Sequence, residues 1–517
     1  MNSEIVEIKI GVEFINDQAY IDKKLDQAKK DDRNYIKSIL KRKSLDSRQR
    51  NILFLLRYEL IFEQENQSNI DDIIYQNTSN SNKEAVIIGA GPAGYFAALQ
   101  LLKDGIRPII FDRGKDVRER RRDLRAIQQD GVVNSHSNYC FGEGGAGTYS
   151  DGKLYTRSYK RGKIQDVLKT LPEQGAPDDI LYDAHPHIGS NKLPKIVSAI
   201  KETIETFGGK IYFNSFIVDI EISNGEVKSV QLENGDSYPC SQLILATGHS
   251  ARDIFYMLHK KAIKLEAKDY AIGMRIEHPQ ELIDEMQYKH APRHENLPAA
   301  SYRLATEIDY KGVFSFCMCP GGLIVPAATA PGEIVVNGMS LSRRDSPFSN
   351  SGFVTAVDHH DFKEFENKGI FSGLEFQKNL ESKLWKYGDG SQKAPAQNIM
   401  DFIDGKTNTA LHDTSYIPGI YNAPLHDLLP KPIVKRISEG LKLFGKRNKQ
   451  YLTKEAQFIG IESRTSSPIR IPRDKSSGQH PQVKGLFPCG EGAGFAGGIL
   501  SACMDGIYCA RNVNANL

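Results

Sequence analysis

The pattern G-x-G-x-x-G could bring backbone amide groups close to a phosphate or an aromatic ring, and the sequence carries it in three places. The copies are GAGPAG at 89–94, GEGGAG at 142–147 and GAGFAG at 492–497. Glycine matters here because it lets the backbone approach a ligand that any side chain would keep away. Since 44 glycines in 517 residues will produce such a pattern by chance, the surrounding sequence must decide which copy binds a nucleotide.

The first copy has the surroundings of a dinucleotide fingerprint. An apolar segment at 85–88 precedes it, apolar residues recur at helical spacing after it, and a second apolar segment at 108–111 ends in Asp112. In such a unit the helix N-terminus faces the pyrophosphate, and the acidic residue accepts hydrogen bonds from a ribose. We therefore assign the nucleotide site to this copy, in preference to an ordinary strand–turn–helix.

Each glycine of this unit has its own expected part. Gly89 makes the tight turn, Gly91 admits the pyrophosphate, and Gly94 allows the helix to pack closely on the strand. The other residues assigned to the nucleotide here are Pro92, Ala93, Asp112 and Arg113.

The two remaining copies indicate FAD rather than NAD. FAD is the longer molecule and needs a second cradle far along the chain, whereas an NAD domain does not. The loop at 138–156 is rich in glycine where a flavin ring and ribityl chain would need close backbone contact. Near the end of the chain, a helix from about Gly498 could point its N-terminus at the flavin and stabilise negative charge there. The cofactor residues assigned to these segments and to the strand end at 243–248 are Gly145, Gly147, Thr148, Thr247, Gly248, Gly490, Glu491, Gly497, Gly498 and Ile499.

Several longer motifs extend beyond the glycines. They are IIGAGPAG, FGEGGAGTYSDGKL, HPHIGSNKL, LATGHSARD, FCMCPGG, ESRTSSPIRI and PCGEGAGFAGGI. Together they resemble a family of uncharacterised bacterial FAD-dependent dehydrogenases, also called NAD(P)/FAD-dependent oxidoreductases, within the glutathione-reductase-type flavoproteins. The resemblance covers nearly the whole chain and implies a fold and a cofactor more directly than a substrate. It also implies that Ile217, in the segment FIVDI, lies against the adenine. Asp112 stands where the family more often has Glu, and its shorter side chain still reaches a ribose hydroxyl.

Cys317 and Cys319 form a C-x-C pair that could cycle as a redox couple, hold a thiolate beside the flavin or bind a metal. A closed zinc site needs four ligands, and no second Cys or His pair stands at a suitable spacing, so we expect no metal. In an extended segment the two thiols would face the same side and could meet one partner. Burial as two small apolar residues is the competing interpretation and is slightly favoured.

Two other segments could bind or protonate a substrate. His187 lies in AHPHIGSNKL and could donate a proton or bind an anion, although a structural turn is slightly favoured. Arg464 lies just before the distal flavin cradle, and its guanidinium could bind a carboxylate or phosphate. Cys317, Cys319, Arg464 and His187 are therefore the candidate catalytic residues.

Composition bounds the class of protein. A net charge of +3, with 40% hydrophobic and 25% charged residues, is ordinary for a globular protein and does not by itself indicate nucleic-acid binding. No apolar run approaches the length of a membrane span, and the first residues do not resemble a signal peptide. Seven cysteines without disulfide-framework spacing fit a reducing compartment. We therefore expect a cytoplasmic protein with no membrane partner, and the composition carries no signal for the oligomeric state.

The elements that must position these residues predict an α/β protein of three domains. In chain order these are residues 1–64, a small ferredoxin-like α+β domain; 65–83, a linker rich in Asn and Ser; 84–262, the first part of a Rossmann-type FAD-binding domain; 263–454, an inserted α+β substrate domain; and 455–517, the second part of the FAD-binding domain. Asn-Gly pairs at 224–225 and 234–235 predict the hairpin turns of a β-meander within the FAD-binding domain.

The leading functional hypothesis is an FAD-dependent oxidoreductase that passes a hydride through flavin N5 to or from an unidentified small molecule. No further strand–glycine–helix unit remains for NAD(P)H, which we therefore expect only as a transient electron donor in the substrate pocket. One alternative is a flavin-dependent RNA-modifying protein. The basic run at 41–50 would serve it, but few aromatic residues interleave that run and a solvated face is favoured. Another alternative is a flavin redox sensor without turnover.

Overall fold

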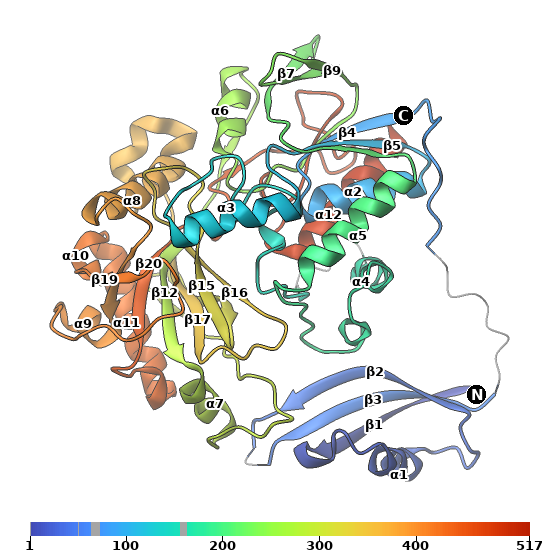
Figure 1. Cartoon of the computed structure of the whole chain (residues 1–517), viewed down its shortest axis with the longest axis vertical. Helices are drawn as coiled ribbons and strands as arrows, with labels where there is room; N and C mark the ends of the chain where they lie inside the picture. The colour runs from blue at the N-terminus through green and yellow to red at the C-terminus, as the bar shows by residue number, and fades with distance from the viewer. Residues whose placement is uncertain (1, 50, 64–72, 156–162) are drawn as a thin grey trace.

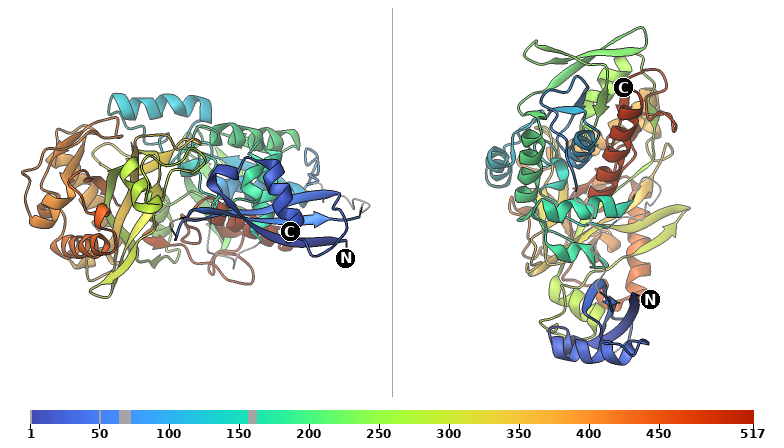
Figure 2. Two further views of the ribbon diagram at one scale, coloured as in Figure 1. Left: turned by 90° about the horizontal axis from the view of Figure 1, so that it is seen from below. Right: turned by 90° about the vertical axis from the view of Figure 1, so that its right-hand side faces the viewer.

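The computed structural model describes residues 2–49, 51–63, 73–155 and 163–517, which form three domains. We call them the N-terminal domain, the parallel-sheet domain and the mixed-sheet domain. Figures 1 and 2 show the N-terminal domain at one end of the molecule and a small antiparallel sheet of the parallel-sheet domain at the opposite end. In the described part of the chain, no helix is both long and apolar enough to cross a membrane.

The N-terminal domain is a three-stranded antiparallel sheet with one described helix. Its elements are β1 (Ser3–Gly11), α1 (Gln18–Ala28), β2 (Lys37–Asp46) and β3 (Leu53–Ile61), and the strand order is β1-β3-β2. Exposed and buried residues alternate along β1, so that Val6, Ile8 and Ile10 share one face with Leu25 of α1. The β-α-β-β order agrees with the sequence prediction.

The parallel-sheet domain contains five parallel strands in the order β22-β10-β4-β5-β6. Their bounds are β4 (Glu84–Ile88), β5 (Arg107–Phe111), β6 (Lys210–Tyr212), β10 (Leu243–Leu245) and β22 (Leu486–Pro488). The strands are apolar because both faces of the sheet are covered. Ala85, Ile87 and Ile110 pack on helices at one face, while Val86 and Ile109 pack toward the antiparallel sheet at the other.

Helices of this domain are α2 (Pro92–Lys103), α3 (Val117–Gln129), α4 (Ile164–Glu173), α5 (Leu193–Thr206), α6 (Arg252–Lys260) and α12 (Ile499–Ala515). Proline at the first position of α2 costs no hydrogen bond, because that N–H has no partner within a helix. Helices α2 and α12 approach so closely that a Cβ on Gly506 would lie 2.0 Å from the carbonyl oxygen of Ala93. The small antiparallel sheet is β7 (Ile217–Ser223), β8 (Glu226–Leu232) and β9 (Ser237–Pro239). Its turns fall at the two predicted Asn-Gly pairs.

The mixed-sheet domain is built on a seven-stranded sheet in the order β13-β14-β17-β12-β20-β18-β19. The strands are β12 (Tyr270–Pro279), β13 (Ala305–Ile308), β14 (Lys311–Cys319), β17 (Phe348–Val357), β18 (Ala394–Asn398), β19 (Ile420–Asn422) and β20 (Gln457–Glu462). Two strand pairs accompany it, β15 (Gly322–Pro326) with β16 (Val336–Ser340) and β11 (Glu266–Ala267) with β21 (Ile469–Arg470). Its helices are α7 (Gln280–Tyr288), α8 (Ser372–Tyr387), α9 (Ile399–Asp404), α10 (Leu425–Leu428) and α11 (Lys431–Arg447).

Two boundaries differ from the sequence prediction. Strand β20 lies inside the seven-stranded sheet, so the mixed-sheet domain continues through Glu462 rather than ending at 454. Residues 65–72 of the predicted linker lie outside the described residues. The end of that linker packs on the parallel-sheet domain, because Thr78 is fully buried and its N–H donates to Phe207 O at 2.9 Å.

Candidate cofactor and substrate site

Two adjoining cavities open at the carboxyl ends of the parallel strands. The larger encloses about 1170 Å³ and the smaller about 310 Å³ of empty volume. Gly89, Asp112, Phe141 and Thr247 line both of them. The two cavities therefore form one elongated space, which we call the cofactor cavity, in the position where open parallel sheets bind ligands.

The glycines of the β4–α2 turn separate into two kinds. A Cβ on Gly89 would lie 2.4 Å from Ala246 O, and one on Gly94 would lie 1.9 Å from Gly89 O, so the protein itself excludes a side chain there. Gly91 differs, because the nearest atom to its Cβ would be Gly145 Cα at 3.9 Å. A side chain on Gly91 would therefore enter the cofactor cavity rather than the protein.

Asp112 lies at the junction of the two cavities and is held in place from behind. Its Oδ2 accepts the N–H of Ala90 and its Oδ1 accepts the N–H of Gly114, both at 2.8 Å. Each carboxylate oxygen keeps a further lone pair for a ligand hydroxyl. This geometry suits the predicted contact with a ribose.

The smaller cavity has an apolar and aromatic wall. The guanidinium of Arg113 lies 4.6 Å from the ring centroid of Phe141 and 4.4 Å from that of Phe216, and it pairs with Asp253 at 2.5 Å. Ile217 lines the same cavity, where its side chain is buried. A flat adenine fits such a surface.

The far end of the cofactor cavity is closed by the C-terminal segment. Gly498 precedes the first residue of α12, and nothing lies within 4 Å of a Cβ built on it. Unpaired N–H groups at a helix N-terminus favour negative charge in front of them. Glu491 also lines this end, and burial raises its pKa to about 7.

The mixed-sheet domain supplies the wall that faces these residues. Cys317, Cys319, Asn337 and Gly338 all line the cavity. The register of β14 shifts between Phe316 and Cys319, and Cys317 has a positive φ of 42°. Because the strand is not regular there, Cys317 is exposed toward the cavity and Cys319 is fully buried, although both residues line the same cavity.

The two thiols are neutral. Desolvation raises the pKa of Cys317 to about 12, and it raises the pKa of Cys319 as well. A buried guanidinium supports the irregular strand, because Arg275 donates to Cys317 O at 2.5 Å and pairs with Glu462 at 2.6 Å. A Cβ on Gly338 would lie 2.1 Å from that guanidinium. The sequence analysis missed Arg275, although an arginine within an otherwise apolar strand is a signal that it could have used.

A charged pair beside the cysteines also escaped the sequence analysis. Asp151 and Lys153 line the cavity, with Lys153 Nζ 3.6 Å from Asp151 Oδ2. Asp151 Oδ2 accepts from Arg344 at 2.7 Å, and Lys153 donates to Met318 O. Burial alone would raise the pKa of Asp151, but Lys153 and Arg344 together hold it below its usual value. The motif that contains them was recognised for its glycines, not for these side chains.

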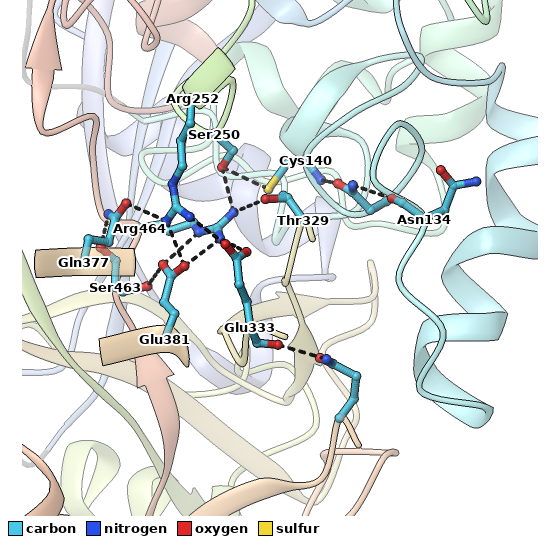
Figure 3. A network of polar contacts seen from close by, with 12 residues as sticks. Asn134, Cys140, Ser250, Arg252, Thr329, Glu333, Gln377, Glu381, Ser463 and Arg464 are labelled. Carbon is cyan, nitrogen blue, oxygen red and sulfur yellow. Dashed lines mark hydrogen bonds and ion pairs between the residues drawn. The ribbon is translucent and has the colours of Figure 1, made fainter. Parts of the chain in front are cut away.

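Arg464 does not reach the cavity, which corrects its assignment as an anion-binding catalytic residue. Its guanidinium pairs with Glu333 at 2.6 Å and with Glu381 at 2.8 Å (Figure 3). Arg252 pairs with the same two carboxylates, at 2.7 Å each. The charges of the two arginines and the two glutamates thus balance. Because the guanidinium of Arg464 is already paired with these carboxylates, it is not available to bind a substrate anion. Arg464 contacts two residues of the cavity wall, Ser250, whose Oγ is 3.4 Å from its guanidinium, and His249, whose Nε2 is 3.0 Å from its carbonyl oxygen.

Four other assigned residues also lie outside the cavity lining. His187 lines a neighbouring groove, and burial lowers its pKa to about 4. Thr148 is buried and donates to Glu143 O at 2.9 Å, so its hydroxyl holds the glycine loop. Gly497 is exposed, and Gly94, as shown above, is required for packing.

The remaining assignments meet in one place. The assigned cofactor residues that line the two cavities are Gly89, Gly91, Pro92, Ala93, Asp112, Arg113, Gly145, Gly147, Ile217, Thr247, Gly248, Gly490, Glu491, Gly498 and Ile499. The cofactor cavity is elongated, with aromatic residues at one end, a carboxylate where its two parts meet and helix N-termini beside it, and this arrangement fits a flavin dinucleotide.

One group of possible metal ligands lies behind the cavity. Side-chain atoms of Cys489, Asp505 and Cys509 lie within 4.8 Å of one another, and all three residues are buried. Arg473 donates to Asp505 at 2.5 Å and to Cys509 at 3.2 Å. The guanidinium thus supplies the positive charge that this cluster needs.

Comparison with known proteins gives matches over different parts of the chain. A family model described as "FAD-dependent protein, C-terminal domain-like" matches residues 269–465, and this range includes β20. An uncharacterized protein of Clostridium beijerinckii is 43% identical over 444 residues, which cover 85% of this chain and 82% of that protein. The ribosomal RNA dihydrouridine synthase of Haemophilus influenzae is 31% identical over 173 residues, covering 32% of this chain and 40% of that enzyme. Among solved structures, glycine oxidase from Geobacillus kaustophilus aligns with 12% identity and a TM-score of 0.36, over 84% of this chain and 95% of that one.

Proposed function

We propose that this chain, which belongs to the same family as the Clostridium beijerinckii protein and contains an FAD-dependent family domain, passes a hydride between FAD and a small molecule in the cofactor cavity. FAD is its cofactor. The observation that carries the proposal is the single elongated cavity, whose two ends differ in chemistry and are lined by residues from two domains.

The residues of the parallel-sheet domain would hold FAD along its length. Ile217 and the aromatic wall would hold the adenine, Asp112 the ribose, and the backbone at Gly91 the pyrophosphate. Gly498 and the N-terminus of α12 would face the flavin end. This order along the cavity is that of a glutathione-reductase-type nucleotide site, which is the finer family that we propose.

When bound, the flavin supplies the capacity to accept and release a hydride. The chain contributes the environment. Lys153 and Asp151 belong to the parallel-sheet domain and place a proton donor and a carboxylate beside the Cys317 wall of the mixed-sheet domain, where they can bind or protonate a polar substrate. Cys317 offers a neutral thiol at the same wall, so we assign it a contact with substrate rather than nucleophilic attack. The mixed-sheet domain thus acts as the substrate domain and excludes water from the flavin end.

The electron donor would use the same cavity. Among the described residues, one glycine-rich strand–turn–helix, that of β4 and α2, is followed by a strand with an acidic residue at its end. That strand is β5, and Asp112 directly follows it. With no further unit of that kind, NAD(P)H would enter the substrate space, react and leave before the substrate binds. Such an order gives parallel lines in double-reciprocal plots, and intersecting lines would exclude it.

The test of the proposed activity is anaerobic mixing of the holoprotein with NADH or NADPH, followed by a screen of acceptors that reoxidise it. We expect rapid bleaching of the flavin absorption and turnover with at least one acceptor. Lys153→Met should slow one half-reaction at least tenfold while the FAD content stays unchanged. Lys442→Ala, on the exposed face of α11, is the control. A holoprotein that no donor reduces would contradict the proposal and favour a sensor.

Reduction of an RNA base is a second candidate, and one observation favours it. The chain is 31% identical over 173 residues to a protein named as a ribosomal RNA dihydrouridine synthase. The N-terminal domain of the present chain also carries the basic edge strand β2. If this function is correct, RNA will reoxidise the reduced holoprotein. RNA that neither binds nor reoxidises it would exclude this candidate and leave the first one standing.

A further inference from the structure

A second cavity lies where the three domains meet, and the proposed function does not use it. It encloses about 1620 Å³ of empty volume. Its walls come from β2 and β3 of the N-terminal domain, residues 177–192 of the parallel-sheet domain, and residues 287–301 and 342–344 of the mixed-sheet domain. We call it the junction groove. In Figure 1 this region lies between the N-terminal domain and helices α4 and α7.

The junction groove and the cofactor cavity share a wall. Arg344 lines the groove, and its Nη2 is 2.7 Å from Oδ2 of Asp151, which lines the cofactor cavity. Beside this ion pair, Lys153 of the cofactor cavity forms a β-bridge with His187 of the groove. A ligand that binds beside Arg344 in the groove would therefore be separated from the cofactor cavity by the Arg344–Asp151 ion pair.

One end of the groove carries two cations from neighbouring segments, because the N–H of Ser342 donates to Asn191 Oδ1 at 2.8 Å. Lys192 and Arg343 line it, are exposed, and form no ion pair with any residue that the structure describes. Burial lowers the pKa of His185, and the positive charges of Arg42 and Arg344 lower it further. This end can thus bind an anion through charged donors without first breaking an existing pair.

Three carboxylates also line the groove, and they come from two different segments of the chain. Asp183 lies at the N-terminal domain, where Lys43 opposes the effect of burial on its pKa. Asp179 belongs to the same segment, and Glu295 comes from the mixed-sheet wall.

The same groove also carries an exposed pair of rings. Tyr155 is 49% exposed, and its ring centroid lies 5.2 Å from that of His185, which lines the groove. Flat exposed rings stack on nucleobases whatever the base, and neighbouring cations bind the phosphates. The exposed rings could thus bind the base of a nucleotide, and the cations could bind its phosphate.

We propose that the junction groove binds a nucleoside phosphate, with the phosphate at Lys192 and Arg343 and the base on the Tyr155–His185 pair. This binding goes beyond the proposed function and does not depend on it. The same chemistry belongs to NADP⁺, to a free nucleotide and to single-stranded RNA, and the experiment separates them.

The test is calorimetric titration of the full-length holoprotein, with its flavin oxidised, at low and moderate salt. The probes are NADP⁺, UMP, a five-nucleotide oligouridylate and inorganic phosphate. We expect at least one nucleoside phosphate to bind, more weakly at higher salt, and the tightest of the three to identify the source. The double variant Lys192→Ala, Arg343→Ala should weaken it at least tenfold, and Tyr155→Ala should weaken nucleotides but not inorganic phosphate. Lys442→Ala is the matched control.

Three results would overturn the proposal. One is that no nucleoside phosphate binds at millimolar concentration, and another is that the double variant binds as tightly as the wild type. The third is that inorganic phosphate binds as tightly as the nucleotides. The flavin absorption of each variant reports its folding, and because no turnover is measured, an inactive oxidoreductase would leave the result readable.

Discussion

Replacing Gly91 by leucine should empty the cofactor cavity while leaving the chain folded. Gly91 has φ −80° and ψ −176°, an extended conformation that leucine adopts, and its Cβ would meet no protein atom closer than 3.9 Å. The cost to folding should therefore stay within about 1 kcal/mol. The new side chain would instead occupy the space in front of the first turn of α2, whose N–H groups are free to bind a pyrophosphate.

The loss of affinity can be estimated from those N–H groups. A hydrogen bond to a charged group contributes about 1.5–3 kcal/mol, so losing two costs about 3–6 kcal/mol. This corresponds to roughly 10²- to 10⁴-fold weaker binding of FAD. The assay is fluorescence titration of the apoprotein with FAD, combined with urea unfolding of the same samples.

Two other glycines provide the contrast. Gly94→Ala should destabilise the fold by about 1–3 kcal/mol or more, because its Cβ would lie 1.9 Å from Gly89 O. Gly312→Ala should change neither property, since its closest contact would be Phe314 at 3.6 Å. A folded Gly91→Leu variant that binds FAD within tenfold of the wild type would refute this reasoning.

Three further outcomes test the site. Arg464→Met should lower the free energy of unfolding by about 3–5 kcal/mol, because Glu333 and Glu381 would then share the single guanidinium of Arg252 and one buried negative charge would be left unbalanced. A stable variant with only a raised KM would restore the anion-binding assignment. The pKa of Glu491 rises from 4.5 to about 7, so the folded apoprotein holds this proton more tightly than the unfolded chain. Its stability should therefore fall as pH rises from about 4.5 to 7, by at most about 3 kcal/mol, and urea unfolding should show that Glu491→Gln removes this pH dependence. Cys317 should react with iodoacetamide at neutral pH roughly 100- to 1000-fold more slowly than a free thiol, as peptide mapping can measure, and fast labelling would reveal a thiolate.

The nucleotide half of the site could be predicted from the sequence because its determinants are local. Gly89, Gly91 and Gly94 stand within one strand–turn–helix, and Asp112 ends the next strand, so spacing alone brings them together. The distal cradle at Gly490–Ile499 carried its own glycine signal. Both segments then meet because β22 and β4 flank β10 in one parallel sheet.

The substrate half depends on long-range pairing that spacing does not encode. Arg464 follows a buried strand and precedes the flavin cradle, yet Glu381 of α8 and Glu333 neutralise it, and neither is near it in the sequence. The end of the mixed-sheet domain was misplaced for the same reason. An apolar strand such as β20 can pair with either sheet, and its neighbours β12 and β18 lie about 60 residues or more away.

The measurement that tests the central claim most directly is the identity and amount of flavin in the purified chain. The cofactor cavity continues beyond Asp112 to an end lined by Phe216 and Ile217, where an adenine would lie, so acid release should yield FAD rather than FMN, at about one per chain. A folded chain that contains FMN, or that stays colourless and cannot be reconstituted with FAD, would contradict the assignment of this cavity.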